Sequence, residues 1–141
     1  MLERLVAMIR PASRYLLAVW TLAIILVSSV PSVPVLKIHT AKTVIRLDYL
    51  IHFCEYGILA FMAYLSFAGN DFKMSYRKFI LITFFLISFA VLDEFHQKFI
   101  PGRAFNAKDI LSDIAGILAV LIFCLVLFRN MANKTGKFDQ D

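Results

Sequence analysis

Four stretches of this chain are each long enough and apolar enough to cross a membrane as a helix. They cover about residues 11–30, 49–68, 76–95 and 110–128. A spanning helix needs about 20 mostly apolar residues. Because lipid offers the backbone no hydrogen bonds, such segments must be helical. The pattern predicts an all-α membrane protein, with residues 1–129 forming one bundle of four transmembrane helices.

The composition supports lipid as the main solvent. Sixty per cent of the 141 residues are apolar, against about 45–50% in a soluble domain. The net charge of +5 comes from bases scattered among the predicted loops. This arrangement predicts contact with anionic lipid headgroups and excludes nucleic acid as a partner. Residues 130–141 form a polar C-terminal tail with the composition of a disordered chain end.

Prolines bound the first apolar stretch. Pro11 suits the first turn of a helix, and Pro31 and Pro34 stop it. The basic residues that precede this stretch would also fit a secretory signal peptide. No small-residue cleavage site of the A-x-A kind follows, however, so we expect a retained helix.

The lysines and arginines predict the orientation of the bundle. An even number of spans puts both termini on one side, and that side carries nine of the 15 Lys and Arg, against six on the other. The positive-inside rule therefore places both termini in the cytoplasm. Residues 31–47 and 96–108 would then lie outside.

Six of the ten acids lie at or near the outer ends of the second, third and fourth helices. In the second helix, Asp48, His52, Glu55 and Tyr56 share one face. A charge at mid-membrane costs roughly 2.5–3.5 kcal/mol, so these side chains should face the bundle and find partners. The alternatives are a helix-packing hydrogen bond for His52 and a paired or snorkelling role for Glu55.

The third helix ends in a second polar group. Glu94 and Gln97 are spaced to point the same way, and Pro101-Gly102 predicts a turn that presents Arg103. The planar guanidinium of Arg103 suits a carboxylate or a phosphate. We expect an ion pair between Arg103 and at least one of Asp48, Glu94, Asp109 or Asp113. The alternative is a solvated loop with Arg103 on a lipid headgroup.

The fourth helix begins with a third polar group. Asn106 is a suitable N-cap, and Asp109 three residues later resembles a capping box. That role does not extend to Asp113, one turn deeper in the membrane. We expect Asp113 to face the bundle interior beside His52, and Gly116 on the same face to allow close helix approach.

These residues, in this order, resemble the VanZ-like family of small bacterial membrane proteins. The family pattern is D-K-x-x-H-F-x-x-Y, then D-E-x-x-Q-x-F-x-P-G-R, then D-x-x-x-N-x-x-G. The counterparts here are Asp48, His52, Phe53 and Tyr56; Asp93, Glu94, Gln97, Phe99, Pro101, Gly102 and Arg103; and Asp109 and Gly116. The sequence departs from the pattern at Tyr49, where lysine is usual, and at Asp113, where asparagine is common.

The resemblance covers about residues 15–128 and implies a multi-pass protein of the bacterial cytoplasmic (inner) membrane. It also implies a link to resistance against glycopeptide antibiotics of the teicoplanin type. No settled biochemical activity comes with the family, so whether the chain is an enzyme stays open.

Three classes of function fit the predicted outward-facing polar pocket. The first is an enzyme acting on an envelope lipid headgroup or a lipid-linked cell-wall precursor. His52 would be its general acid or base, oriented by Asp48 or Glu94, with Asp113 as a further catalytic group. Substrate binding would fall to Arg103, Gln97, Tyr56 and Asp109, and a divalent cation could be held by Glu94, Asp109 and Asp113. The second class is a non-catalytic envelope binding or accessory protein. The third is a small proton- or ion-coupled transporter that uses Asp113, Glu55 and His52.

Overall fold

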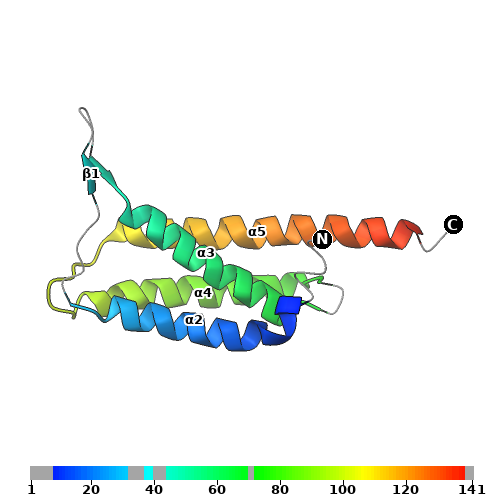
Figure 1. Cartoon of the computed structure of the whole chain (residues 1–141), viewed down its shortest axis with the longest axis horizontal. Coiled ribbons are helices and arrows are strands. Elements are labelled where there is room, and N and C mark those ends of the chain that lie inside the picture. The colour runs from blue at the N-terminus through cyan, green and yellow to red at the C-terminus, as the bar shows by residue number, and fades with distance from the viewer. Residues whose placement is uncertain (1–7, 32–36, 40–43, 70–71, 139–141) are drawn as a thin grey trace.

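The computed structural model describes residues 8–31, 37–39, 44–69 and 72–138, and side chains within residues 8–31, 47–69 and 72–128. Four long helices lie side by side along one axis (Figure 1). A 3-10 turn, η1 (Arg10–Ala12), leads into α2 (Ser13–Ser28). The other three helices are α3 (Asp48–Phe67), α4 (Tyr76–Gln97) and α5 (Ala107–Phe138).

Four helical segments of the described chain are long and apolar enough to cross a membrane. They are Arg10–Ser28, Asp48–Phe67, Tyr76–Gln97 and Ala107–Phe128. These bounds agree with the four predicted spans to within about three residues. The chain is therefore a multi-pass membrane protein built as a four-helix bundle, as the sequence predicts.

Two features depart from the sequence expectations. The strands β1 (Lys37–His39) and β2 (Val44–Arg46) form a short antiparallel hairpin between α2 and α3, with Ile38 paired to Ile45. The hairpin projects to the side of the bundle, at the end where α3 begins (Figure 1). Helix α5 continues to Phe138, so residues 130–138, expected to lack regular structure, are helical.

Successive helices run in opposite directions, so the end of one helix lies beside the start of the next. The C-terminal ends of α2 and α4 lie at the same end of the bundle as the N-terminal ends of α3 and α5 (Figure 1). Because the predicted polar residues all belong to these helix ends or to the 98–106 loop, the fold gathers them at one end. We call this end, with the side chains of Ser28, His52, Tyr56, Asp93, Glu94, Gln97, Asn106, Asp109 and Asp113, the polar end.

Helices α3 and α5 form the most extensive helix–helix interface. Gly116 sets their spacing, because a Cβ at this position would overlap the carbonyl oxygen of Phe53. Gly57 lies one turn further along, where an added Cβ would be 3.2 Å from Cγ2 of Val120. The predicted close approach at Gly116 is thus confirmed, and it fixes the register of His52 against α5.

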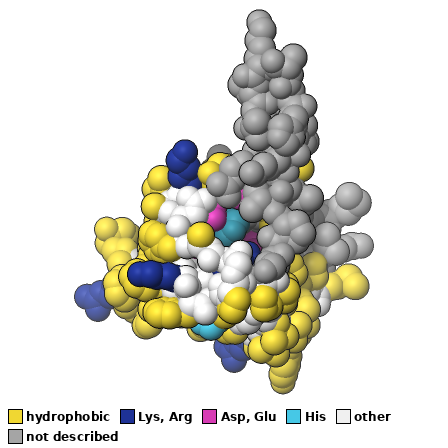
Figure 2. Space-filling model, turned by 90° about the vertical axis from the view of Figure 1, so that its left-hand side faces the viewer, with side chains coloured by type: hydrophobic (Ala, Val, Ile, Leu, Met, Phe, Trp, Pro, Cys, Tyr) yellow, Lys and Arg dark blue, Asp and Glu magenta, His cyan; other side chains and the backbone are white. Residues whose placement is uncertain are grey.

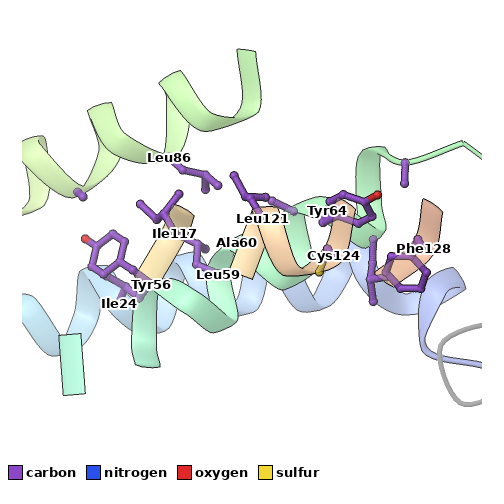
Figure 3. Close-up of a cluster of buried hydrophobic side chains, with 14 residues drawn as sticks. Ile24, Tyr56, Leu59, Ala60, Tyr64, Leu86, Ile117, Leu121, Cys124 and Phe128 are labelled. Carbon is purple, nitrogen blue, oxygen red and sulfur yellow. The ribbon is translucent and has the colours of Figure 1, made fainter. Parts of the chain in front are cut away.

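A continuous apolar core fills the bundle beyond the polar end. Leu59, Ile117, Leu121, Cys124 and Phe128 are all almost fully buried in it. Figure 3 shows these side chains stacked along α3 and α5, with Tyr56 at one extreme and Phe128 at the other. The polar groups of the polar end are therefore separated from the opposite end by several turns of apolar packing.

Candidate functional site

His52 is held by an acid from the facing helix. Its Nδ1 lies 3.0 Å from Oδ1 of Asp113, whose side chain is only 2% exposed. When Asp113 is ionised, its carboxylate can only accept a hydrogen bond, so Nδ1 of His52 then carries the hydrogen and donates this bond. The structure confirms that Asp113 faces the interior beside His52. Asp113 holds the ring; neither Asp48 nor Glu94, the two residues expected to orient it, does so.

The second nitrogen of His52 faces the start of α5. Nε2 lies 4.0 Å from Oδ2 of Asp109, and the two side chains are 14% and 10% exposed. His52 thus stands between two carboxylates, one deeply buried and one nearer the surface. Its Nε2 is the ring nitrogen that a molecule entering from this end of the bundle could reach.

Asn106 caps α5 and ties Asp109 to Glu94. Its Oδ1 accepts a hydrogen bond from the backbone N–H of Lys108 at 3.1 Å, and its Nδ2 donates to Oδ1 of Asp109 at 3.0 Å. The backbone N–H of Asn106 donates to Oε1 of Glu94 on α4, at 2.6 Å. In a capping box the third helical residue would accept that N–H; here Glu94 takes this place from another helix. The carboxylates of Asp109 and Glu94 therefore lie at the N-terminus of α5, where the positive end of the helix dipole favours negative charge.

Asp93 joins α4 to α2. Its Oδ1 accepts a hydrogen bond from Ser28 Oγ at 2.6 Å, and its Oδ2 accepts one from Gln97 Nε2 at 3.1 Å. All three side chains are buried. Gln97 therefore serves Asp93, one turn before it on the same helix. Asp93 on α4 and Asp113 on α5 also interact electrostatically.

Two buried polar atoms of the site have no hydrogen bond of good geometry with any residue that the structure describes, although one of them, the Tyr56 hydroxyl, interacts with the Asp93 carboxylate. They are the hydroxyl of Tyr56, a residue with no exposed surface, and Oε2 of Glu94, a residue that is 1% exposed. An unpaired buried polar atom costs roughly 1–3 kcal/mol. Glu55 is half-buried on the same helix as Tyr56 and interacts electrostatically with His52 and Asp113. The site therefore has hydrogen-bonding capacity beyond what its own side chains use.

Arg103 does not take the position expected of it. The turn is present, with the Arg103 N–H donating to Ile100 O at 3.1 Å and Gly102 at a φ of 77°, as a type II turn requires. The guanidinium, however, donates to the backbone carbonyls of Val27 at 2.9 Å and Val30 at 3.3 Å. No acid in the described part of the chain lies in salt-bridge range of Arg103, so the expected ion pair is wrong. Arg103 closes the C-terminal end of α2 instead.

The metal-binding prediction finds no support in this geometry. Within residues 8–31, 37–39, 44–69 and 72–138, no three His, Cys, Asp or Glu side chains are placed to hold a metal ion together. Glu94, Asp109 and Asp113 instead each bond a different group: the Asn106 backbone, the Asn106 amide and His52. Asp48 starts α3, one turn before His52.

Sequence reasoning missed the contribution of the first helix. Ser28 of α2 binds Asp93, and Ser29 Oγ lies 3.1 Å from Nε2 of His96. The hydroxyl of Ser29 donates to Ile25 O at 2.6 Å, so it has no proton left to give His96. A serine near the end of an apolar helix carries little signal by itself. The spacing of Asp93 and Gln97 on one helix face is the pattern that could have revealed their bond.

The polar end is open to its surroundings at its centre. Figure 2 looks onto it and shows a histidine side chain and acidic side chains among backbone and apolar atoms. His52 and Asp109 are partly exposed there, while Asp113 and Glu94 lie beneath the surface. The arrangement offers a proton-transfer group, His52, to a molecule at this end, with acids and unpaired polar atoms around it.

Comparison with known proteins identifies the family of this chain. A search of curated proteins and a search of solved structures each find no match. The sequence profile of the VanZ/LLP1 family matches residues 13–129, which include three whole spans, all of the first span except residues 10–12, and every residue of the polar end. The chain belongs to the VanZ/LLP1 family.

Proposed function

We propose that this protein acts on the polar headgroup of an envelope lipid or a lipid-linked cell-wall precursor, with His52 as the general acid or base. The observation that carries the proposal is the 3.0 Å hydrogen bond between His52 and the buried Asp113. A histidine whose Nδ1 is fixed by a carboxylate keeps Nε2 free to take or give a proton. The partly exposed Nε2 side of His52 suits this task.

The substrate would enter among the unpaired polar atoms of the polar end. Its donors and acceptors would meet Oε2 of Glu94, which has no partner among the described residues, and the hydroxyl of Tyr56 beside Asp93, after displacing the side chains that bury both atoms. Asp109 would contact the same group from the start of α5, next to His52. His52 would then remove a proton from a hydroxyl of the headgroup or from water. Arg103, bonded to the end of α2, would support this site without touching the substrate.

The proposed setting is the non-cytoplasmic face of the bacterial inner membrane, because nine of the 15 Lys and Arg lie on the side of the termini. Single cysteines at Ala104 and Tyr76, in a chain without Cys54 and Cys124, test this orientation. Both positions are exposed and lie at opposite ends of the bundle. An impermeant thiol reagent should label Ala104→Cys in intact cells and Tyr76→Cys only after the membrane is opened. The reverse pattern would overturn the orientation.

The activity is tested with purified protein in vesicles of bacterial polar lipids, followed by mass spectrometry of the headgroups. The wild type should produce a new or altered headgroup species. His52→Gln, which keeps hydrogen bonding but cannot transfer a proton, should lower its formation by about 100-fold or more. His96→Gln is the matched control, because His96 is exposed at the same end and its side chain bonds Ser29 alone among the residues that the structure describes. Lipid profiles that are identical with and without wild-type protein would exclude the enzyme.

A second candidate function is binding of the headgroup without turnover. It is favoured by the partners of His52: both are carboxylates, and no hydroxyl or thiol of the described chain is bonded to the ring as a nucleophile. Lipid that copurifies with the wild type but not with Glu94→Ala, in the absence of any product, would support the binder. The family resemblance adds the expectation that expression changes sensitivity to a teicoplanin-type glycopeptide.

Transport through a single chain is the weakest candidate. The polar groups end at the level of Tyr56, and the buried residues beyond it are almost all apolar. An ion or proton would have to cross several turns of close packing, including Leu59, Ile117 and Leu121. Proton flux into vesicles that depends on His52 would reverse this ranking.

A further inference from the structure

An apolar groove lies between α2, α3 and α4, in the half of the bundle away from the polar end. It encloses about 420 Å³. Leu17 and Thr21 line it from α2, Ala63 from α3, and Leu86 and Phe89 from α4. Lys78 is the one charged residue in its lining. A groove of this composition at membrane depth is filled by hydrocarbon, since water would find almost no partners there.

The length of the groove matches one leaflet of a bilayer. Lys78 and Phe89, at its two extremes on α4, are 11 residues apart. At 1.5 Å per residue this is about 17 Å, against about 15 Å for half of the hydrocarbon core. The groove therefore has room for one extended acyl chain of the leaflet opposite the polar end. The groove ends near the middle of the membrane at Phe89, whose ring packs against that of Tyr56 with 6.0 Å between the ring centroids.

Lys78 supplies the charge that selects the headgroup. It lies in the first turn of α4, at the outer mouth of the groove, and its side chain is exposed. A lysine in this position lays its methylene stem along the apolar wall and extends its ammonium to the headgroup level. We propose that the groove binds one acyl chain of an anionic glycerophospholipid, with the lipid phosphate on Lys78. This inference is independent of the proposed function, because it uses none of the residues of the polar end.

The headgroup part is tested by native mass spectrometry of the delipidated full chain. Phosphatidylglycerol is titrated against phosphatidylcholine with the same acyl chains. One phosphatidylglycerol should bind the wild type about fivefold more tightly than phosphatidylcholine, as expected for one lysine at a membrane surface. Lys78→Gln should abolish this preference. Arg77→Gln is the matched control, because Arg77 is exposed on the same turn but does not line the groove, and it should keep the preference.

The groove itself is tested with a side chain that fills it. Thr21→Phe projects a ring into the groove. The hydroxyl that is lost from Thr21 bonds the Leu17 carbonyl of its own helix, so the variant should still fold. This variant should lose the bound lipid, while Leu22→Phe, on the lipid-facing side of α2, should retain it. Equal lipid binding by Thr21→Phe and Leu22→Phe would overturn the proposed groove. A preference for phosphatidylglycerol that survives Lys78→Gln, or falls equally with Arg77→Gln, would overturn the role of Lys78.

Discussion

The two ends of the bundle are closed in the same way but filled differently. At each end an arginine from outside the helix caps a helix C-terminus: Arg10 donates to Ala68 O, just after α3, at 2.8 Å, and Arg103 donates to Val27 O, in the last turn of α2. At the Arg10 end, Tyr64 also bonds a backbone carbonyl, that of Phe72. At the polar end the described side chains bond one another, as in the pairs Ser28–Asp93 and His52–Asp113.

This contrast separates what closes a helix from what forms a site. Bonds from side chains to orphan carbonyls satisfy helix ends and are expected in any bundle. Buried carboxylates bonded to other side chains, next to unpaired atoms such as Glu94 Oε2, add a cost that closure of the helices does not require. The Arg10 end instead packs rings, with Phe72 and Phe128 stacked 5.2 Å apart. We therefore assign function to the polar end and stability to the Arg10 end.

The largest expected effect follows from separating α3 and α5. Gly116→Val places atoms against the backbone of Phe53, which cannot give way without a shift of the helix. We expect a loss of more than about 3 kcal/mol of stability, above the usual cost of overpacking. Gly57→Ala is the control, since the nearest atom to its Cβ is in the movable side chain of Val120, at 3.2 Å, and the Gly116 carbonyl oxygen is at an ordinary contact distance of 3.7 Å. Thermal unfolding in detergent measures both, and equal melting temperatures would mean that the close approach does not hold the polar end together.

The next effect comes from the buried acid that holds His52. Asp113→Leu leaves His52 Nδ1 without its acceptor and should cost about 2–3 kcal/mol of stability together with the activity. Asp113→Asn keeps shape and a hydrogen-bonding oxygen, so the protein should stay folded while the headgroup reaction slows. Stability and headgroup analysis are measured on both variants. A silent Asp113→Leu would remove helix α5 from the site.

Removing either arginine cap should lower the stability of the protein by the same amount and leave its activity unchanged. Arg103→Gln and Arg10→Gln each remove charge-assisted bonds to carbonyl oxygens, for a loss of about 1–2 kcal/mol. Neither should change headgroup turnover per folded molecule, measured in the vesicle assay. If Arg103→Gln alone stops turnover while its stability matches Arg10→Gln, Arg103 contacts the substrate and our division between closure and site is wrong.

The smallest effect tests the bond between α2 and the site. Ser28→Ala removes the donor to buried Asp93 and should cost about 1 kcal/mol, whereas Ser29→Ala, at a half-buried position, should stay within about 0.5 kcal/mol. Chemical denaturation in mixed micelles can resolve this difference. Equal losses for the two serines would show that the Ser28–Asp93 bond contributes nothing to the attachment of α2.

The sequence predicted the features that depend on hydrophobic length and helical register. It did not predict the contacts that depend on how the helices pack against one another. Hydrophobic length located the four spans, and helical register correctly placed Asp113 toward His52 and Gly116 in the α3–α5 contact. Arg103 was misplaced because nearby acids and orphan carbonyls both attract a guanidinium, and only the packing of the 98–106 loop on α2 decides between them.

Other misses have similar causes. Ser28 shows no pattern until α4 brings Asp93 beside it. The β1–β2 hairpin lies in a stretch rich in β-branched residues, which favour strands but leave no signal in hydrophobic length. The polar composition of residues 130–138 outweighed their helical propensity in our prediction, although their alanine, lysine and methionine residues favour a helix.

The central claim is that Asp113 fixes the His52 ring and leaves Nε2 for chemistry at the polar end. Nitrogen NMR of ring-labelled histidine in nanodiscs tests it most directly, with His52→Gln assigning the His52 signals. We predict that Nδ1 of His52 carries a strongly hydrogen-bonded proton and that this signature disappears in Asp113→Leu while the signals of His96 stay unchanged. A His52 ring that is unprotonated at Nδ1, or unaffected by Asp113→Leu, would contradict the account.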